Sequence, residues 1–443
     1  YADSMFNFNL SVKIYRSIAS LGFIDYTNIL QGNPGIGGSE FQVILNSYLL
    51  SQNPKYKIYL FAQTESNFPK GIDIIYETDL KKCIQLCKDY EIKYFIFKEQ
   101  PQWITNQCFQ NIPFGLNLIV WCHNFLPCKR LDFYAQHSFF KSIIMVGKEQ
   151  AELYRDHKAF SKIDYIYNSN IIPTQEEIKD LTPCNNRKNI VTYIGSIYPY
   201  KGFHLLAKAW KKITQCIPDA ELYVIGSADV YNVNSHKGEY NIALPNYEKI
   251  FISYLTENGK LMKNVHFMGK LGIEKNDILK KTKVGVPNPS GKTETFGISA
   301  IEMQLMGCCV VTKKCCGFLD TVINKKNLYT RNSSLANYII KNLKSPNINY
   351  SITYNAIKRK FDYTITIKEW DNLFENLEQN NPKIHDFCHN IHNKEFELKW
   401  LRLITQKINE HFNYLLPPLI KWKEGKIYRK LEYLADKEAF TKN

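Results

Sequence analysis

The chain has 443 residues, of which 44% are hydrophobic and 14% aromatic, and its 57 Lys and Arg against 42 Asp and Glu leave a formal net charge of +15. This length exceeds what one hydrophobic core usually supports, so we expect two domains of roughly 150–200 residues each and a further segment; the apolar content excludes a chain that is disordered throughout. The positive charge favours anionic partners such as nucleotide phosphates, an acidic membrane surface or nucleic acid.

The first part of the chain alternates short apolar runs with segments of helical period. Helices are predicted at 79–90 and 148–157. Runs rich in Ile, Val, Tyr and Phe predict strands at 56–62, 94–97, 116–123, 142–147 and 163–168. This alternation predicts a parallel sheet with right-handed crossovers, in an α/β domain that spans residues 1–180.

A second alternating set follows a polar stretch. Residues 172–189 contain Pro173 and Pro183 and would suit a hinge between domains. The segment 201–213 is predicted to be a helix, because four of its apolar residues fall on one face: Phe203, Leu206, Trp210 and Ile213. Strands are predicted at 190–196, 220–227 and 265–271. We therefore expect a second, similar α/β domain at 181–365.

The strand pattern ends near residue 365, and residues 366–443 predict a helical extension in which Pro417-Pro418 interrupts any helix. One interpretation is an appendage that packs back on the first domain. The alternative is an interfacial element whose Lys and Arg meet anionic lipid while its apolar side chains enter the headgroup region. Those apolar side chains would be Trp400, Leu401, Phe412, Leu416 and Trp422.

Loops that follow strands are the places to search for chemistry, because ligands of open parallel sheets bind beyond the carboxyl ends of the strands. The segment GNPGIGGSE (32–40) precedes a helix-like run, and its Gly35, Gly37 and Gly38 would let the backbone approach a phosphate. A plain turn explains this segment equally well. The loop GSIYPYKG (195–202) places Lys201 at the start of a helix, where a cation could neutralise a diphosphate, although a solvated surface Lys is the competing interpretation.

The segment ETFGISAIE (294–302) carries two carboxylates. Glu294 is expected in a loop mouth after a strand, and Glu302 on the following helix about one turn in. Carboxylates accept hydrogen bonds from the hydroxyls of sugars and riboses, and amides near Phe296 and Gly297 would suit a phosphate between them. The two acids are therefore predicted to hold two polyols rather than a metal.

A metal site is not predicted. The twelve cysteines form no CxxC pair and indicate buried free thiols. His385, His389 and His392 would share a helical stripe beside Cys388, but no second segment supplies further ligands. No run of about 18 apolar residues occurs and the N-terminus lacks the regions of a signal peptide, so we expect a cytoplasmic protein without a transmembrane helix.

Taken in order, these motifs resemble glycosyltransferase family 4, the retaining glycosyltransferases of the GT-B fold. ETFGISAIEMQLMGCCVVT resembles the family's two-Glu signature, and VTYIGSIYPYKGFHLLAKAW its strand, loop, Lys-Gly and helix. GIGGSE, IVWCHN and YIYNSNIIP resemble the glycine loop, the active-site His segment and the run before the interdomain linker. The resemblance covers roughly residues 25–370 and implies two Rossmann-like domains that face across a cleft.

The resemblance also implies roles for individual residues. Glu294 would bind donor-sugar hydroxyls, Glu302 the ribose and Lys201 the diphosphate, while His123 would lie beside the sugar, although a lone His at a strand end is often a core residue. Catalysis would thus rest on His123, Lys201 and Glu294, and the nucleotide-sugar site would comprise Gly37, Gly38, Ser196, Lys201, Glu294, Phe296, Gly297, Ile298 and Glu302. The family usually has Arg where this chain has Ser196, which leaves Lys201 with more negative charge to neutralise.

The sequence as a whole predicts a metal-independent retaining transferase with no prosthetic group. Its donor would be a nucleotide sugar, with UDP favoured and GDP retained, and its acceptor a glycan, a lipid-linked group or a protein. Alternatives are a nucleotide-sugar epimerase of the same fold, or a weakly catalytic protein that binds membrane or nucleic acid. Nucleic acid ranks last, because no nucleic-acid-binding motif is visible.

Overall fold

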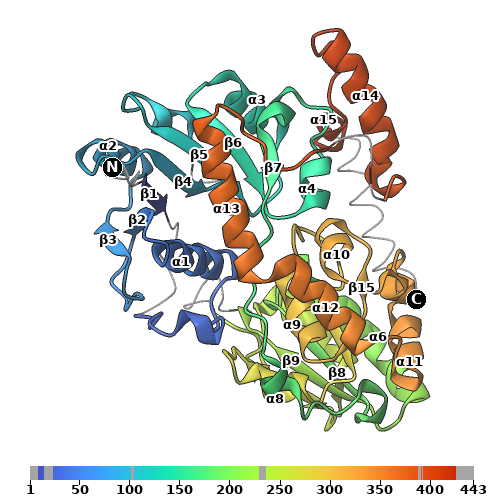
Figure 1. The fold of residues 1–443 in the computed structure, drawn as a ribbon. Helices are drawn as coiled ribbons and strands as arrows, with labels where there is room; N and C mark the ends of the chain where they lie inside the picture. The colour runs from blue at the N-terminus through green and yellow to red at the C-terminus, as the bar shows by residue number, and fades with distance from the viewer. Residues whose placement is uncertain are drawn as a thin grey trace. The chain divides into compact units, whose positions relative to one another are not determined.

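The computed structural model describes residues 8–13, 23–100, 104–228, 236–387, 391 and 393–425, with only the backbone of 8–13. The described residues fall into two compact units (Figure 1). Unit 1 contains those of 1–16, 42–169 and 364–443, and unit 2 those of 17–41 and 170–363. The domain ranges drawn from the sequence, 1–180, 181–365 and 366–443, remain predictions.

Unit 1 is built on one parallel sheet of seven strands in the order β3-β2-β1-β4-β5-β6-β7. The strands are β1 Phe8–Lys13, β2 Tyr56–Ala62, β3 Asp73–Tyr76, β4 Tyr94–Lys98, β5 Asn117–Cys122, β6 Phe140–Met145 and β7 Ile163–Tyr165. All five predicted strands are present. β1 and β3 were not predicted, since β1 is partly polar and β3 is a short edge strand without buried side chains.

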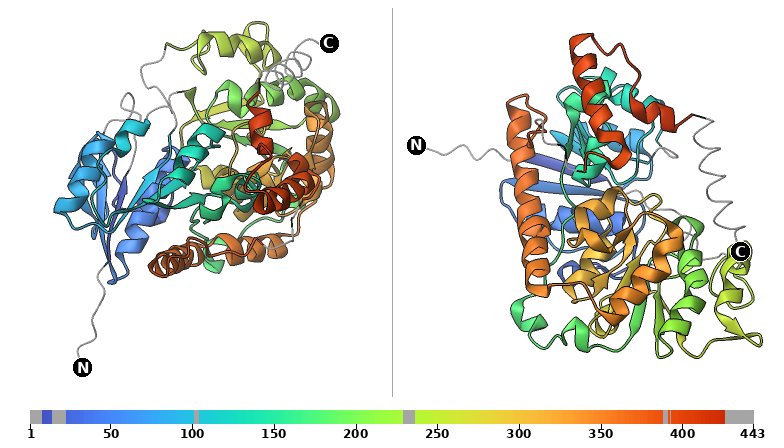
Figure 2. Two further views of the ribbon diagram at one scale, coloured as in Figure 1. Left: turned by 90° about the horizontal axis from the view of Figure 1, so that it is seen from above. Right: turned by 90° about the vertical axis from the view of Figure 1, so that its right-hand side faces the viewer.

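Helices flank this sheet, as two further views show (Figure 2). They are α1 Gly38–Ser51, α2 Leu80–Asp89, α3 Cys128–Gln136, α4 Lys148–Glu152, α13 Tyr363–Glu378, α14 Lys399–His411 and α15 Leu419–Lys423. α2 begins as predicted, because the Asp79 side chain accepts a hydrogen bond from the Lys82 amide. The predicted helix 148–157 was too long. It ends at Glu152, because the next amides bond to carbonyls three residues back and a 3-10 segment, Lys158–Lys162, follows.

Unit 2 contains a second parallel sheet, in the order β12-β9-β8-β13-β14. Its strands are β8 Ile190–Ile194, β9 Glu221–Ile225, β12 Val265–Gly269, β13 Val284–Pro287 and β14 Cys309–Val310, beside the short pairs β10 Thr256–Glu257 with β11 Lys260–Leu261 and β15 Thr312–Lys313 with β16 Leu328–Tyr329. Because β8 pairs with both β9 and β13, the strand order reverses at β8. This reversal is where open α/β sheets bind ligands.

The helices of unit 2 are α5 Gln175–Ile178, α6 Phe203–Cys216, α7 Pro245–Phe251, α8 Lys275–Leu279, α9 Ile298–Leu305, α10 Cys316–Thr321, α11 Leu335–Lys344 and α12 Tyr350–Phe361. α6 buries the four apolar residues that the sequence places on one face. This face belongs to the core of unit 2, where it packs with side chains of β8, β9 and β13. The second predicted α/β arrangement is therefore present.

Arg187 joins three segments of unit 2. Its buried guanidinium donates hydrogen bonds to the carbonyl oxygens of Thr182 (2.8 Å), Thr282 (2.8 Å), Met306 (2.9 Å) and Leu279 (3.2 Å). The segment 172–189, predicted as a hinge, is thus tied into this unit at its end. Carbonyls that lose a buried donor carry a desolvation penalty.

Replacing Arg187 should destabilise unit 2. Arg187→Met removes all four donors and leaves buried carbonyls unsatisfied, so the free energy of unfolding should fall by about 3 kcal/mol. Urea unfolding measures this loss. The exposed Arg331 is a matched control, and Arg331→Met should change stability by about 0.5 kcal/mol or less. Equal losses in the two variants would contradict the structural role of Arg187.

Within unit 1, His385 ties the segment after α13 to β7 and α13. Its Nδ1 lies 2.9 Å from Asp164 Oδ1 and its Nε2 3.4 Å from Glu369 Oε1, and its ring stacks on Tyr165 with centroids 4.0 Å apart. Burial opposes protonation of His385, but the hydrogen bonds with the two carboxylates outweigh burial and raise its pKa to about 9. His385 is therefore protonated at neutral pH.

This ion pair makes stability depend on pH. Because the folded pKa of about 9 exceeds the ordinary value of 6.5, the stabilisation is complete below pH 6.5 and is lost as the pH rises through 9. We expect the free energy of unfolding to fall by up to about 3 kcal/mol over this window. Denaturant titrations at pH 6 to 9.5 should show this slope in the parent and a much smaller one in His385→Asn. Identical pH profiles for the two proteins would refute the assignment.

Candidate functional site

Two loops meet at the carboxyl end of the unit 2 sheet, where the strand order reverses. One follows β8 (residues 195–202) and the other follows β13 (residues 288–297). They touch at Gly202 and Ser290: the Ser290 hydroxyl donates to the Tyr200 carbonyl (2.6 Å), and a Cβ on Gly202 would lie 2.6 Å from the Ser290 nitrogen. Gly202 also has a φ of +69°, so glycine is required on both grounds. This contact fixes the positions of the side chains around it.

Lys201 and Glu294 form an ion pair across these loops. Lys201 Nζ lies 3.0 Å from Glu294 Oε2, and their side chains are 25% and 14% exposed. Asn288 Nδ2 donates to the same oxygen at 2.8 Å. Oε1 of Glu294 takes no hydrogen bond from the described residues. The Lys201 ammonium and an oxygen of Glu294 that can accept a hydrogen bond from a hydroxyl therefore lie side by side at the carboxyl end of the sheet.

Asn288 holds this carboxylate and was missed by the sequence analysis. It is buried, its Nδ2 also donates to the Lys292 carbonyl (3.0 Å), and its Oδ1 lies 2.8 Å from the Ser290 hydroxyl, which can share its proton between Asn288 and the Tyr200 carbonyl. Thr293, directly before Glu294, has a φ of +56°, which is strained for a β-branched residue. The only sequence signal was an Asn in a Pro-rich loop after a strand. Backbone strain next to a carboxylate that is held by several partners is typical of functional sites.

Glu302 belongs to a second ion pair. It lies on α9, and its Oε1 is 3.1 Å from Nζ of Lys275, the first residue of α8. Lys275 was also missed by the sequence analysis. Its segment GIEKND (272–277) follows the predicted strand at 265–271, just as the other loops of the site follow predicted strands. Glu294 and Glu302 thus each have a lysine partner.

The start of α9 is formed by Phe296, Gly297 and Ile298. Gly297 precedes the helix with a φ of +91°, and a Cβ there would lie 2.6 Å from the Phe318 ring. The Phe296 side chain is buried, with its ring centroid 5.6 Å from that of Phe361. The sequence analysis considered only the amide of Phe296, whereas its side chain belongs to the core.

The glycine loop lies in unit 2, apart in sequence from the rest of that unit. Asn33 Oδ1 accepts hydrogen bonds from the amides of Gly35 (2.9 Å) and Ile36 (2.8 Å), a cap that the sequence analysis did not identify. A Cβ on Gly38 would lie 3.6 Å from Ile298, whereas one on Gly37 would meet no heavy atom within 4 Å. The structure therefore brings this loop beside the start of α9.

Ser196 and His123 complete the predicted residues. Ser196 follows β8, and its buried Oγ has no hydrogen-bond partner among the described residues. His123 follows β5 in unit 1, with its ring centroid 4.6 Å from that of Trp121. Burial and the nearby Lys98 ammonium lower the pKa of His123 well below its usual value, so its imidazole is neutral at pH 7.

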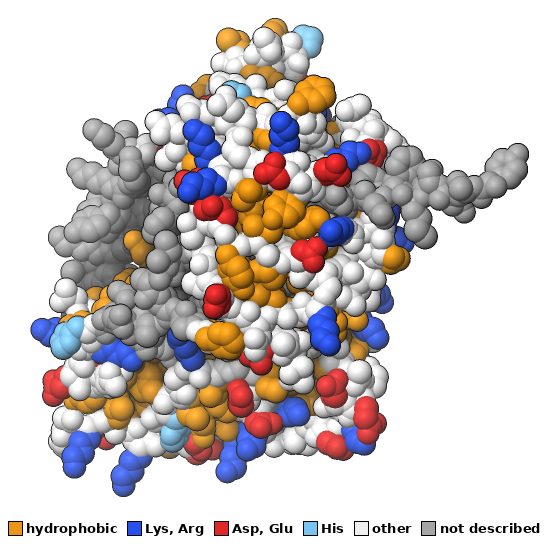
Figure 3. Space-filling view, turned by 90° about the vertical axis from the view of Figure 1, so that its left-hand side faces the viewer, with side chains coloured by type: hydrophobic (Ala, Val, Ile, Leu, Met, Phe, Trp, Pro, Cys, Tyr) orange, Lys and Arg blue, Asp and Glu red, His pale blue; other side chains and the backbone are white. Residues whose placement is uncertain are grey.

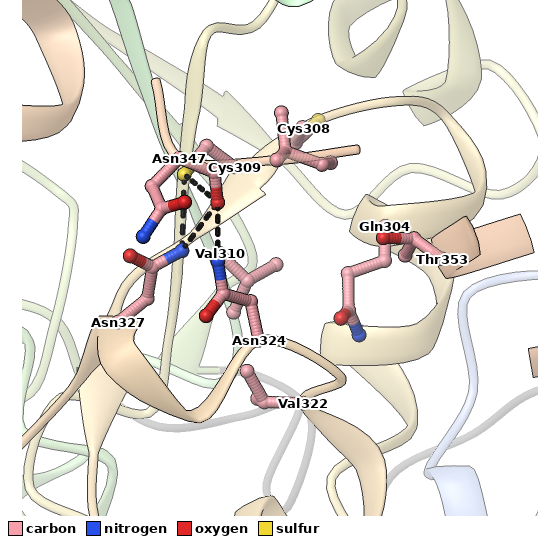
Figure 4. A pocket seen from close by; sticks show the side chains of 10 residues that line it. Gln304, Cys308, Cys309, Val310, Val322, Asn324, Asn327, Asn347 and Thr353 are labelled. Carbon is pink, nitrogen blue, oxygen red and sulfur yellow. Dashed lines mark hydrogen bonds between the residues drawn. The ribbon is translucent and has the colours of Figure 1, made fainter. Parts of the chain in front are cut away.

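The remaining predictions concern metal binding and thiols. The predicted His stripe cannot be followed, because His389, His392 and Cys388 lie outside the described residues. No group of three or more potential metal ligands occurs in the described ranges, where the eleven cysteines form no disulfide and are mostly buried. A cavity of about 10 Å³ beside Cys309, room for one water molecule, is lined by none of the predicted site residues (Figure 4).

Comparisons with known proteins identify the second part of the chain. Residues 174–359 match the model of the family "Glycosyl transferases group 1". The GPI3 subunit of phosphatidylinositol N-acetylglucosaminyltransferase from Saccharomyces cerevisiae is 20% identical over 211 residues, which are 45% of this chain. That match spans 42% of the length of the yeast protein.

Solved structures share the architecture of the described residues. Sucrose-phosphate synthase from Thermosynechococcus elongatus superimposes with a TM-score of 0.60 at 16% identity, over 84% of this chain and 99% of that one. Anabaena HepE, solved with UDP and glucose, superimposes with a TM-score of 0.56 at 16% identity, over 83% and 99% of the two chains. At this identity the likeness establishes the fold. The chain therefore has the GT-B fold, and its residues 174–359 are similar to the glycosyl transferases group 1 family.

Proposed function

We propose that the protein is a retaining glycosyltransferase that moves a hexose or an N-acetylhexosamine from a nucleotide diphosphate sugar to an acceptor. The observation that carries the proposal is the pairing of Lys201 with Glu294, 3.0 Å apart at the reversal of strand order. In a nucleotide sugar the sugar hydroxyls lie next to the diphosphate. In the same way the Glu294 carboxylate, which can accept hydrogen bonds from hydroxyls, lies next to the Lys201 ammonium, which can pair with phosphate. The pair matches both halves of such a donor.

Each group has a role in this proposal. Lys201 moves from Glu294 to the diphosphate, and Oε1 of Glu294 accepts a hydrogen bond from a donor-sugar hydroxyl. Glu302 accepts hydrogen bonds from the ribose hydroxyls, while Lys275 pairs with its carboxylate. The phosphates would lie along two backbone segments, one at Gly37 and Gly38 and the other at the start of α9, Gly297 and Ile298.

Catalysis in this proposal depends on stabilising the leaving diphosphate. As the bond between the anomeric carbon and the phosphate oxygen breaks, negative charge grows on phosphate and the sugar gains oxocarbenium character. Lys201, the Ser196 hydroxyl and the N-terminus of α6 supply positive charge and hydrogen bonds, together several kcal/mol. Attack on the same face, with the leaving phosphate taking the acceptor proton, would retain the anomeric configuration, and no metal is required.

His123 acts in this proposal as a neutral hydrogen-bonding group. Since the pKa of its imidazole is well below the usual value, it adds no charge near the oxocarbenium-like sugar. A neutral ring can donate to, or accept from, a sugar hydroxyl. This role fits the position of His123 after a strand of unit 1.

The donor and acceptor are proposed from the relatives. UDP is favoured because the Anabaena protein was solved with UDP and glucose, and GDP remains the alternative. N-Acetylglucosamine is proposed from the yeast relative, a subunit of phosphatidylinositol N-acetylglucosaminyltransferase. We propose a glycan, lipid-linked or protein acceptor, in a cytoplasmic protein that is peripheral to the cytoplasmic face of a membrane.

A nucleotide-sugar epimerase of this fold is the second candidate. It would convert the donor without an acceptor, whereas a transferase would release nucleoside diphosphate slowly by hydrolysis. Incubation with a panel of nucleotide sugars therefore separates the two, because an isomerised sugar would identify an epimerase. A weakly catalytic binding protein would do neither.

Glu294→Gln should abolish most turnover. The amide is a weaker acceptor for a donor hydroxyl and forms no ion pair with Lys201, so nucleoside diphosphate release should fall by about 100-fold or more. The exposed Glu257 is a matched control, and Glu257→Gln should retain activity. Thermal unfolding should report that both variants fold. Unchanged turnover in Glu294→Gln would contradict the assignment.

Asn288→Ala should impair the positioning of the Glu294 carboxylate rather than the binding of the nucleotide. Loss of one hydrogen bond to a charged group costs ~1.5 kcal/mol, which predicts about a tenfold fall in kcat. The thermal shift produced by UDP should be retained, because Asn288 holds the Glu294 carboxylate and is not one of the residues proposed to hold the nucleotide. Asn288→Asp keeps the shape but lacks the donor, and should lose at least as much activity. Loss of UDP binding with an unchanged kcat would contradict this positioning role of Asn288.

A further inference from the structure

The sheet of unit 1 has a reversal of strand order of its own. β1 pairs with β2 on one side and with β4 on the other, so the order reverses at β1. Open α/β sheets bind ligands beyond the carboxyl ends of the strands at such a reversal. Lys201 and Glu294 occupy the equivalent place in unit 2. The reversal in unit 1 is therefore a second place where the fold favours a ligand.

Lys98 lies at this reversal as the last residue of β4. In the sheet register it is opposite Trp121 of β5, so the two side chains share one face of the sheet. His123 follows two residues after Trp121, and the centroids of their rings are 4.6 Å apart. Burial lowers the pKa of the His123 imidazole, and the Lys98 ammonium is close enough to add to this shift. A cation and a neutral imidazole therefore adjoin at the carboxyl end of the sheet.

Burial distinguishes Lys98 from a surface lysine, because only 8% of its surface is exposed. On the face shown in Figure 3, Lys and Arg side chains are scattered among Asp and Glu side chains, so charges there offset one another. The acid next to Lys98 in sequence is Glu99, whose carboxylate accepts hydrogen bonds from Arg130 Nε (3.1 Å) and from the Tyr134 hydroxyl. Water screens a buried charge less than a surface one, so Lys98 should attract an anion more strongly than an exposed lysine does.

The backbone around these two residues is held in place. Lys98 belongs to the hydrogen-bonded ladder of β4 and β5. Gln150, buried on α4, donates from Nε2 to the carbonyl oxygens of Cys122 (3.2 Å) and Asn124 (2.9 Å), which flank His123. Groups that are already fixed lose little conformational entropy when a ligand binds. The ammonium and the imidazole are therefore preorganised.

We propose that Lys98 and His123 bind a phosphate group of the acceptor, so that the acceptor is a phosphorylated compound. This inference rests on the proposed function, because it names the chemical class of the acceptor. An ammonium and an imidazole N–H both donate hydrogen bonds, and a phosphate offers several acceptor oxygens. One ring nitrogen of His123 donates to the phosphate, which leaves the other for the sugar hydroxyl of the proposed function.

Phosphate binding to the UDP-loaded protein tests the proposal. Saturating UDP fills the proposed diphosphate site of unit 2, so inorganic phosphate titrated by calorimetry at constant ionic strength reports a second site. The parent should bind phosphate saturably. Lys98→Met should weaken this binding by about tenfold or more, because the charged donor is lost. Lys98→Gln should do the same, and thermal unfolding should report that both variants fold. The exposed Lys70 is a matched control in unit 1, and Lys70→Met should bind phosphate like the parent.

Further titrations separate an acceptor phosphate from the phosphates of the donor. Glycerol 3-phosphate should displace inorganic phosphate and glycerol should not, whereas a site that excludes the phosphate ester could not hold an acceptor. UDP should bind Lys98→Met as it binds the parent. A tenfold loss of UDP affinity would assign Lys98 to the donor and overturn the proposal. So would equal phosphate binding by Lys98→Met and the parent, or no saturable binding by the parent. A protein that bound phosphate at Lys98 but no nucleotide would instead refute the proposed transferase function.

Discussion

The reversal of strand order at β8 is the constraint on which the candidate site depends. Because β13 pairs with β8 on the side opposite β9, the loops after β8 and β13 emerge next to one another. Gly202 then allows the backbone of one loop to press on Ser290 of the other. The ion pair of Lys201 and Glu294 follows from that contact, although 93 residues separate them in sequence.

Buried polar groups give this region its precision. Asn288 organises the loop around Glu294, and Arg187 ties the start of the second sheet to the ends of α8 and α9. Both use several hydrogen bonds from one side chain, Asn288 to hold a loop and Arg187 to hold loop backbone and helix ends. Such networks are costly when incomplete, so they specify one arrangement of the loops.

The same physics operates with a different outcome at α14. There the buried charges do not shape a site but select which face of a helix is exposed. An apolar surface that is held outward by ion pairs differs from one left exposed for want of a core. The first requires complementary charges on the α14 side and the α4 side, which here are Lys399 and Arg402 against Glu149, Glu152 and Asp156.

The sequence by itself determined the local structure: five strands of unit 1, the buried face of α6 and the break at Pro417-Pro418 follow from period and composition. It also placed Lys201, Glu294 and Glu302 in or just after loops that follow strands. It did not identify Asn288 or Lys275 as partners, and it left open which face of α14 lies inward. Those depend on which loops and helices become neighbours, and strand order and buried charge pairs decide this only when the chain is folded.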